Sequence, residues 1–269
     1  MNVTACKQEL LNLLRKAGEI LLSAHEVEAE NAVFDKNGTA NFVTVYDVRV
    51  QNFLIEHLTE KFPNAQFLAE EKENDAAVLE SEVCFVIDPI DATTNFIHDY
   101  RHSCISLAMI SFGKPVFGAI YDPYLEEMFC AEVGKGAELN GNPIHVSSRS
   151  MEIGVAAYGT APYYKEKLAR LTFDLSHDIF LACADLRRCG SAALDLAYLA
   201  AGRNDLFFEC ILSPWDYAAG MLLVSEAGGL VSDMNGAPLS LSTPCPIIAA
   251  NPLIYPKLLE IVKPYASEL

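Results

Sequence analysis

Residues 83–96 read Val-Cys-Phe-Val-Ile-Asp-Pro-Ile-Asp-Ala-Thr-Thr-Asn-Phe and carry the strongest fold signal in the chain. The apolar run Val83–Ile87 predicts a buried strand that ends at Asp88, directly before a proline. A second carboxylate, Asp91, follows three residues later, and residues 93–95 are suited to begin a helix. Two carboxylates at the end of a buried strand are costly unless a cation balances them. We therefore expect a hard-metal site here, with an anion held at the neighbouring helix start.

The overall charge of the chain is strongly negative. The 269 residues include 19 basic and 36 acidic side chains, which gives a formal net charge of −17. This composition disfavours direct binding to nucleic acid or to an anionic membrane surface. An anionic substrate would need metal cations to screen its approach. Apolar residues make up 51% of the chain, enough for one large domain or two modest ones.

The cysteines and the uncharged segments indicate a cytoplasmic protein. No two of the eight cysteines have Cys-x-x-Cys spacing, so we expect reduced cysteines in the core. The N-terminus mixes charged residues into a helical pattern, unlike a signal peptide. The longest uncharged run, residues 234–256, is interrupted by prolines and cannot form a membrane helix.

Hydrophobic periodicity predicts a mixture of helices and strands. Helices are expected at residues 5–28, 44–61, 162–174, 191–202, 214–227 and 253–263. Strands are expected at residues 67–69, 83–87, 103–111, 115–121, 127–132, 155–158, 205–209, 230–233 and 247–250. Short turns join the middle strands, which predicts an antiparallel meander and an α+β or layered α/β fold. A weak change in composition near residue 148 suggests two halves, 1–148 and 149–269.

Two further acidic residues stand at the ends of apolar elements. Glu70 follows the short strand 67–69, and Asp216 follows the only tryptophan in the first turn of an expected helix. Taken alone, Glu70 is typical of a solvated loop and Asp216 of a carboxylate favoured by a helix dipole. Together with Asp88 and Asp91, they fit an all-oxygen site for Mg²⁺.

These motifs resemble those of the inositol monophosphatase family. Residues 88–96 are similar to that family's Asp-Pro-Ile-Asp-Gly-Thr-Thr-Asn-Phe, and Trp215-Asp-Tyr-Ala-Ala-Gly with Glu226-Ala-Gly-Gly resembles its second motif. Further matches occur in order at residues 43–47, 70–71, 134–141 and 190–195. The resemblance covers nearly the whole chain. It implies an αβαβα sandwich, the fold shared by inositol monophosphatase and fructose-bisphosphatase (the sugar phosphatase fold).

The resemblance also implies a reaction and its metal ligands. The expected reaction is Mg²⁺-dependent hydrolysis of a phosphate monoester by direct attack of metal-activated water. Glu70, Asp88 and the backbone carbonyl of Ile90 would hold one ion, and Glu70 would anchor a third, hydrated ion. A second ion would be held by Asp88, Asp91 and Asp216. Two to three Mg²⁺ ions are thus implied, with Mn²⁺ as a substitute and Li⁺ and Ca²⁺ as inhibitors.

The remaining site residues follow from the same resemblance. Thr93, paired with Asp47, would orient and activate the water, and backbone N–H groups of Ala92 and Thr93 would receive the phosphate. Glu209 would contact substrate hydroxyls. Ser191 and Ala192 would line the same alcohol-binding side.

The substrate is left open among several phosphate esters. Inositol monophosphate fits the motifs best, and a small phosphorylated polyol or sugar is the expected partner, bound by a homodimer. Alternatives on the same scaffold are fructose 1,6-bisphosphate, histidinol phosphate, adenosine 3′,5′-bisphosphate and NADP. A non-catalytic regulatory protein that keeps the fold is a further alternative. The segment 155–190, where substrate loops would fall, matches no recognisable pattern.

The chain departs from the family motif at one position, and three other features could be mistaken for metal-binding, substrate-binding or catalytic residues. Ala92 stands where the family has glycine, and we expect its methyl group to be tolerated if its φ is negative. His98 and His102 are four residues apart, but the sequence between them predicts a loop and not a helical metal-ligand pair. Lys36 is expected to be an exposed loop lysine. Ser191 follows a glycine but lacks the Gly-x-Ser-x-Gly pattern of a nucleophile.

Overall fold

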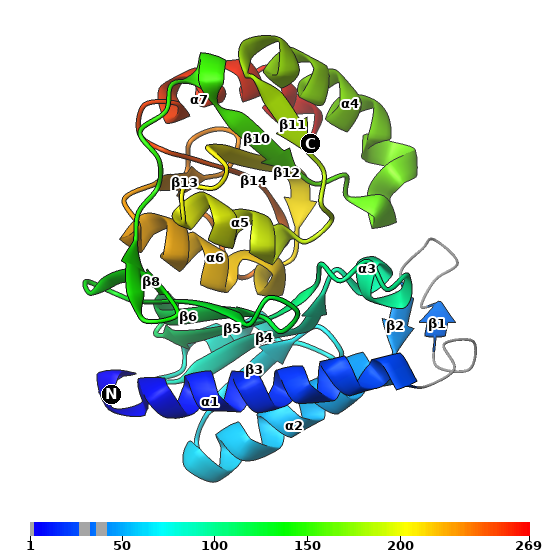
Figure 1. Cartoon of the computed structure of the whole chain (residues 1–269), viewed down its shortest axis with the longest axis vertical. Helices are drawn as coiled ribbons and strands as arrows, with labels where there is room; N and C mark the ends of the chain where they lie inside the picture. Colours follow the sequence, from blue (N-terminus) through cyan, green and yellow to red (C-terminus); the bar gives the residue numbers. More distant parts are fainter. Residues whose placement is uncertain (1–2, 27–32, 36–41) are drawn as a thin grey trace.

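The computed structural model describes residues 3–26, 33–35 and 42–269, and it forms five layers (Figure 1). Helices α1 (Val3–Leu22) and α2 (Val45–Lys61) cover the outer face of a seven-stranded sheet. Helices α5 (Ala192–Ala200) and α6 (Pro214–Glu226) lie between that sheet and a five-stranded one. The far face of the second sheet is covered by α4 (Lys165–Ala182) and α7 (Tyr255–Val262). This is the expected αβαβα sandwich.

The seven-stranded sheet contains the expected meander. Its strands, in spatial order, are β3 (Gln66–Ala69), β4 (Cys84–Asp91), β5 (Cys104–Ser111), β6 (Lys114–Asp122), β7 (Glu127–Glu132), β8 (Gly136–Leu139) and β9 (Asn142–Ile144). Neighbours pair antiparallel except β3 and β4, which are parallel. The carboxyl ends of β3 and β4 therefore lie at the same edge of the sheet, which brings Glu70 next to the end of β4.

The five-stranded sheet is mixed. Its strands, in spatial order, are β11 (Asp185–Arg187), β10 (Val155–Tyr158), β12 (Leu206–Leu212), β14 (Cys245–Ala250) and β13 (Leu230–Ser232). Strand β10 pairs parallel with both β11 and β12, and β14 pairs antiparallel with both of its neighbours. A separate ribbon is formed by β1 (Val33–Asp35) and β2 (Phe42–Thr44).

Close backbone contacts place α6 against the first sheet. A Cβ at Gly118 of β6 would lie 2.9 Å from the Cα of Ala219, and a Cβ at Gly220 would lie 2.6 Å from the Leu196 side chain of α5. Glycine is therefore required at both positions for the helix pair to pack this closely. Because α5 and α6 belong to the second half of the chain, residues 1–148 and 149–269 share a core. The domain boundary near residue 148 stays a prediction.

Two expected helices have clearly different bounds in the structure, whereas the others shift by two residues at most. The first α-helix ends at Leu22 and continues as a 3₁₀ turn over Ser23–Glu26, while residues 27–28 lie outside the described residues. The helix expected at 162–174 was wrong at both ends. Ala161 has a φ of 44°, Pro162–Tyr164 form a 3₁₀ turn, and α4 then runs to Ala182. Strand β11, inside the segment that matched no pattern, was not expected at all.

The cysteines only partly follow the expectation. All of those in the described residues are free, and five are buried, but Cys183, Cys189 and Cys245 are only half-buried. In the described parts of the chain, no helix has the length and apolar character needed to span a membrane.

Candidate active site

A cavity of about 460 Å³ opens where the end of β4 meets the starts of α5 and α6. Ten residues of the site expected from the sequence line it: Glu70, Asp88, Ile90, Asp91, Ala92, Thr93, Ser191, Ala192, Glu209 and Asp216. Asp47 is fully buried, is not part of the lining, and reaches the site through Thr93. The structure thus gathers the expected residues from both halves of the chain.

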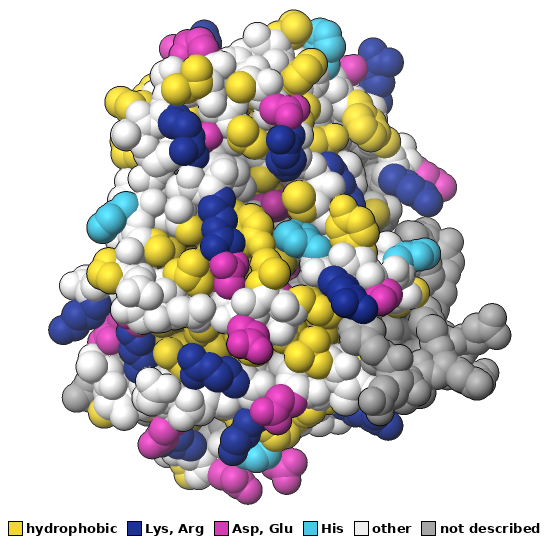
Figure 2. Space-filling view, viewed as in Figure 1, with side chains coloured by type: hydrophobic (Ala, Val, Ile, Leu, Met, Phe, Trp, Pro, Cys, Tyr) yellow, Lys and Arg dark blue, Asp and Glu magenta, His cyan; other side chains and the backbone are white. Residues whose placement is uncertain are grey.

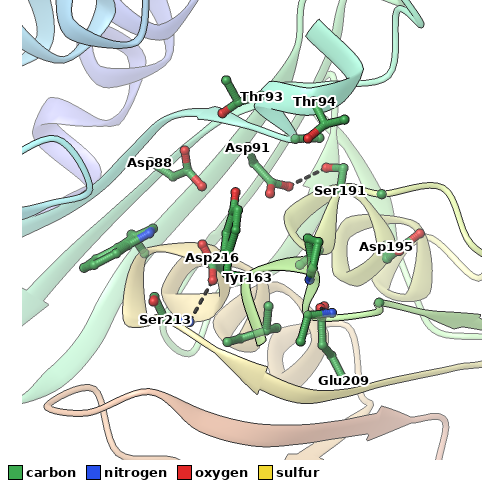
Figure 3. Close-up of a pocket in the computed structure, with 18 of the residues that line it drawn as sticks. Asp88, Asp91, Thr93, Thr94, Tyr163, Ser191, Asp195, Glu209, Ser213 and Asp216 are labelled. Atoms are coloured by element: carbon green, nitrogen blue, oxygen red, sulfur yellow. Dashed lines mark hydrogen bonds between the residues drawn. The ribbon is translucent and has the colours of Figure 1, made fainter. Parts of the chain in front are cut away.

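A β-bulge at the end of β4 aims Asp88 and Asp91 into the cavity. Residues three apart on a regular strand point to opposite faces. Asp88 pairs with Ser106 and Asp91 with Cys104, so two residues of β4 oppose a single residue of β5. The extra residue turns Asp91 to the same side as Asp88, as Figure 3 shows. Pro89, which has no N–H to donate, fits this irregular position.

The start of α5 is attached to Asp91. Ser191 caps the helix, because its hydroxyl accepts a hydrogen bond from the N–H of Leu194 at 3.2 Å. The same hydroxyl donates to Asp91 Oδ2, and the N–H of Ala193 donates to that oxygen at 2.9 Å (Figure 3). A carboxylate of the first half therefore anchors a helix of the second half.

Asp216 occupies the third position of α6. Its Oδ2 accepts a hydrogen bond from the N–H of Ser213 at 2.7 Å, in a capping box that begins with Ser213 and Pro214. The helix-start interpretation of Asp216 is therefore correct. It does not conflict with a place in the site, since Asp216 also lines the cavity.

The carboxylates at the site repel one another. Burial raises the pKa of Asp88 well above its ordinary value, and the charges of Glu70, Asp91 and Asp216 raise it further. The pKa of Asp216 is also raised well above its ordinary value, first by burial and then by Asp91 and Glu70. In the described lining, Arg188 brings the only basic side chain. An excess of buried carboxylate oxygen fits hard divalent cations such as Mg²⁺.

The carboxylates surround the cavity without meeting at one point. In the part of the chain that the structure describes, no three of them bring oxygens within 4.8 Å of one another. Figure 3 shows the hydroxyl of Tyr163 pointing between Asp88, Asp91 and Asp216. Burial raises the pKa of this phenol, and the surrounding acidic charges raise it further. The donor chemistry, and not a preformed coordination geometry, is what fits metal ions here.

Thr93 connects the cavity to Asp47. The Thr93 hydroxyl lies 3.2 Å from Asp47 Oδ1 and 3.1 Å from the carbonyl oxygen of Ile90, both of which accept hydrogen bonds. Asp47 Oδ2 in turn accepts hydrogen bonds from the backbone N–H and the hydroxyl of Thr44, at 2.7 and 2.5 Å. Asp47 is thereby held in one orientation by the start of α2, and it can receive the proton of Thr93.

We expect the metal-free protein to lose stability as the pH rises from 4.5 to 7. Burial raises the pKa of Asp47 to about 6 and that of Glu209 from 4.5 to about 7. Between the unfolded and folded pKa values the folded state holds more protons, so the free energy of unfolding decreases with pH. Thermal unfolding in EDTA at a series of pH values measures this trend. In Glu209→Gln the melting temperature should decrease less steeply as the pH approaches 7. A melting temperature that rises through this interval would contradict the burial of these acids.

The conformation of Ala92 does not meet the condition, a negative φ, under which its methyl group was expected to be tolerated. Ala92 has φ 72° and ψ 51°, in the left-handed region, and stands at the N-cap of α3 (Thr93–Ile97). A side chain costs roughly 1–2 kcal/mol in this conformation, whereas glycine adopts it freely. With five residues, α3 also contributes little helix dipole. An anion at this turn would rely on the individual N–H groups.

Ala92→Gly is expected to stabilise the protein by up to about 1 kcal/mol, because the relieved strain exceeds the extra backbone entropy of glycine. This corresponds to a rise of roughly 2–4 °C in melting temperature. Ala169→Gly, in the middle of α4, is the matched control and should lower it by a similar amount. An equal decrease in melting temperature for Ala92→Gly and Ala169→Gly would show that the backbone of Ala92 is not strained.

Tyr163, Arg188 and Asp195 are among the lining residues to which the sequence assigned no role. Tyr163 lies in the 3₁₀ turn before α4, and Arg188 lies in the loop after β11. Both belong to the segment 155–190, which matched no recognisable pattern. Asp195 stood in a quoted motif but was given no role, although an acid inside the apolar run 192–200 was a usable signal. His98 is exposed and His102 half-buried, on a loop as expected. Lys36 lies outside the described residues.

Comparisons with known proteins agree with this fold. The model of the "Inositol monophosphatase family" matches residues 3–267. "Nus factor SuhB" of Salmonella typhimurium is 38% identical over 94% of each chain, and "Inositol monophosphatase 3" of Solanum lycopersicum is 36% identical over 85% of each. The crystal structure of "extragenic suppressor protein suhB" from Bartonella henselae superposes with a TM-score of 0.89 at 36% identity. It covers 96% of this chain and 98% of its own. The chain therefore belongs to the inositol monophosphatase family of phosphatases.

Proposed function

We propose that this protein hydrolyses a phosphate monoester with the help of Mg²⁺, and that inositol monophosphate is its best-fitting substrate. The observation that carries the proposal is the set of buried and half-buried, mutually repelling carboxylates beside the Thr93–Asp47 pair. Glu70, Asp88, Asp91, Asp216 and the Ile90 carbonyl would hold two to three ions. When bound, Mg²⁺ would neutralise phosphate charge and acidify water.

Thr93 and Asp47 would position the attacking water. The Thr93 hydroxyl has one proton and two neighbouring acceptors, Asp47 Oδ1 and the Ile90 carbonyl. While that proton points to either acceptor, the lone pairs of Thr93 can accept a hydrogen bond from water. Asp47, with a pKa of about 6, is ionised near neutral pH and can accept the proton that Thr93 passes on. The backbone N–H groups of Ala92 and Thr93 would receive the phosphate.

Glu209 would recognise the alcohol part of the substrate. Its Oε1 accepts a hydrogen bond from the N–H of Ala161 at 2.9 Å, and its Oε2 lies against Gly159. A Cβ at Gly159 would come within 1.9 Å of Oε2, so only glycine leaves room for this carboxylate. An oriented carboxylate beside a cavity suits the hydroxyl groups of a polyol, with Ser191 and Ala192 on the same side.

A panel of phosphate esters tests the substrate. Inositol monophosphate should give the highest kcat/KM, ahead of fructose 1,6-bisphosphate, histidinol phosphate, adenosine 3′,5′-bisphosphate and NADP. Glu209→Gln should raise KM for inositol monophosphate with less effect on kcat, because it weakens binding away from the phosphate. The name of the tomato relative supports this choice. A better substrate among the nucleotides would overturn the inositol assignment and leave the reaction type standing.

Several finer properties belong to the same proposal. Mn²⁺ should replace Mg²⁺ in supporting activity, while Li⁺ and Ca²⁺ should inhibit. The protein should be a homodimer that needs neither nucleic acid nor membrane and acts in the cytoplasm. Sedimentation of the purified protein tests the dimer.

A regulatory role is the second candidate, because the Salmonella typhimurium relative is named a Nus factor. On the face shown in Figure 2, Lys and Arg side chains are scattered among acidic ones and form no continuous basic patch. With a net charge of −17, contact with a protein partner is favoured over direct contact with nucleic acid. Absence of turnover on the whole ester panel with saturating Mg²⁺ would favour this candidate over the phosphatase.

A further inference from the structure

Three potential metal ligands of a different kind lie next to the carboxylate site. His102, Cys189 and Asp195 each bring one ligand atom within 4.8 Å of the other two. His102 lies two residues before β5, Cys189 lies in the loop before α5, and Asp195 is in the first turn of that helix. Figure 3 shows Asp195 beyond the Ser191 turn, away from Asp88 and Asp216. Asp195 lines the same cavity, but the group shares no residue with the carboxylates that would hold Mg²⁺.

Two of these three side chains place polar atoms inside the protein with few partners. Asp195 is only 2% exposed, and in the described parts of the chain its carboxylate accepts no hydrogen bond, so that only the charge of Arg188 offsets its burial. Nε2 of His102 is also buried without a hydrogen-bond partner among the described residues. Burying a carboxylate and an imidazole nitrogen unpaired is costly. Burial lowers the pKa of His102, which leaves the imidazole neutral and able to act as a ligand.

We propose that His102, Cys189 and Asp195 bind a zinc ion. Imidazole, thiolate and carboxylate together are typical ligands of Zn²⁺, whereas Mg²⁺ takes oxygen ligands. Three protein ligands leave a fourth position for water. In a tetrahedral zinc site, ligand atoms are about 3.3–3.8 Å apart. Because the ligand atoms lie within 4.8 Å of one another, they need to approach by at most about 1.5 Å, which rotation of the half-buried Cys189 and His102 can provide.

The backbone around this group is already ordered. The side-chain amide of Asn95 donates to the carbonyl oxygens of His102, at 2.8 Å, and Cys189, at 2.9 Å. This amide joins the β5 entry to the loop before α5 and holds two of the three ligands in register. A Cβ at Gly190 would come within 3.1 Å of the same amide, so this loop packs closely on Asn95. Zinc would add a second link between the two halves, and we expect it to raise the melting temperature.

Co²⁺ titration of the full chain tests the site, with excess Mg²⁺ present to fill the oxygen-ligand site. The wild type should bind about one equivalent and show a near-ultraviolet thiolate-to-cobalt charge-transfer band, which Zn²⁺ abolishes by competition. An all-oxygen site cannot produce this band. Cys189→Ser should remove the band. His102→Gln should weaken Co²⁺ binding by more than about tenfold. Losing a residue that only orients a metal ligand typically costs about 10–100-fold in affinity, and His102 would be a ligand itself.

Control variants distinguish this site from other thiols. Cys183→Ser changes another half-buried free cysteine outside the group and should keep the band. Cys104 is buried with its sulfur 3.8 Å from Asp91, so Cys104→Ser tests whether the ion binds at the carboxylates. The proposal is overturned if the wild type shows no band, or if the band survives Cys189→Ser and His102→Gln. It is also overturned if only Cys104→Ser removes the band. None of these outcomes depends on phosphatase activity.

Discussion

Asp88→Asn should lower kcat/KM for a phosphate monoester by at least about 10³-fold and yet raise the melting temperature measured in EDTA. The activity falls because an amide has no charge to attract a divalent ion, and metal assistance contributes several kcal/mol, at about 1.4 kcal/mol per tenfold. The metal-free protein gains stability because Asp88 is buried among Glu70, Asp91 and Asp216, whose charges repel it. A carboxylate with a purely structural role would lose stability when neutralised.

Asp216→Asn should lose activity to a similar extent, and Asp233→Asn is the matched control. Asp216 and Asp233 both accept backbone hydrogen bonds, Asp233 from Asn235 and Ala237 at 2.8 and 2.7 Å, but Asp233 lies outside the cavity lining. Released phosphate and thermal unfolding, each with and without Mg²⁺, measure both effects. Near-normal Mg²⁺-dependent activity in folded Asp88→Asn would show that the metal assignment is wrong.

Thr93→Val should lower kcat by about 10²–10⁴-fold, the usual contribution of a positioned proton-transfer group. Valine has nearly the shape of threonine but cannot bond to water, to Asp47 or to the Ile90 carbonyl. KM should change much less than kcat, because the phosphate-binding N–H groups belong to the backbone. Single-turnover measurements at saturating Mg²⁺ give the effect on the chemical step.

Thr93→Ser is the matched control for this substitution, since it keeps the hydroxyl and removes only a methyl group. It should retain activity within about tenfold. Asp47→Asn combined with Thr93→Val should cost little more than either change alone, because the two residues act as one unit. Additive losses in the double variant would show that Asp47 and Thr93 act separately.

Most of the elements could be predicted because their signals are local. The strand Val83–Ile87 is a continuous apolar run, and α6 begins with a proline and an acid in its first turn. The start of α4 could not be predicted in this way. The left-handed backbone of Ala161, which precedes the 3₁₀ turn, has no distinctive residue type to announce it. Strand β11 is too short for a periodic signal and exists through its pairing with β10.

In the candidate site, too, some residues could be recognised from local sequence and others only from tertiary contacts. The four acids were recognisable because each ends an apolar element or begins a helix. The sign of φ at Ala92 could not be predicted, since a tight turn between β4 and α3 sets it. His102 and Cys189 are 87 residues apart and share no motif, and Asn95, which binds the backbone of both, is one of the contacts that bring them together.

The sequence by itself indicated the phosphatase family, because Asp88, Asp91 and Asp216 stand in motifs that resemble those of the inositol monophosphatase family. Only the tertiary structure decided how these residues combine. The bulge in β4 turns Asp91 to the side of Asp88, and the contact of Gly118 with Ala219 brings α6, with Asp216, up to the sheet. Short-range patterns encode single elements, whereas the packing of distant segments depends on close contacts that no local pattern records.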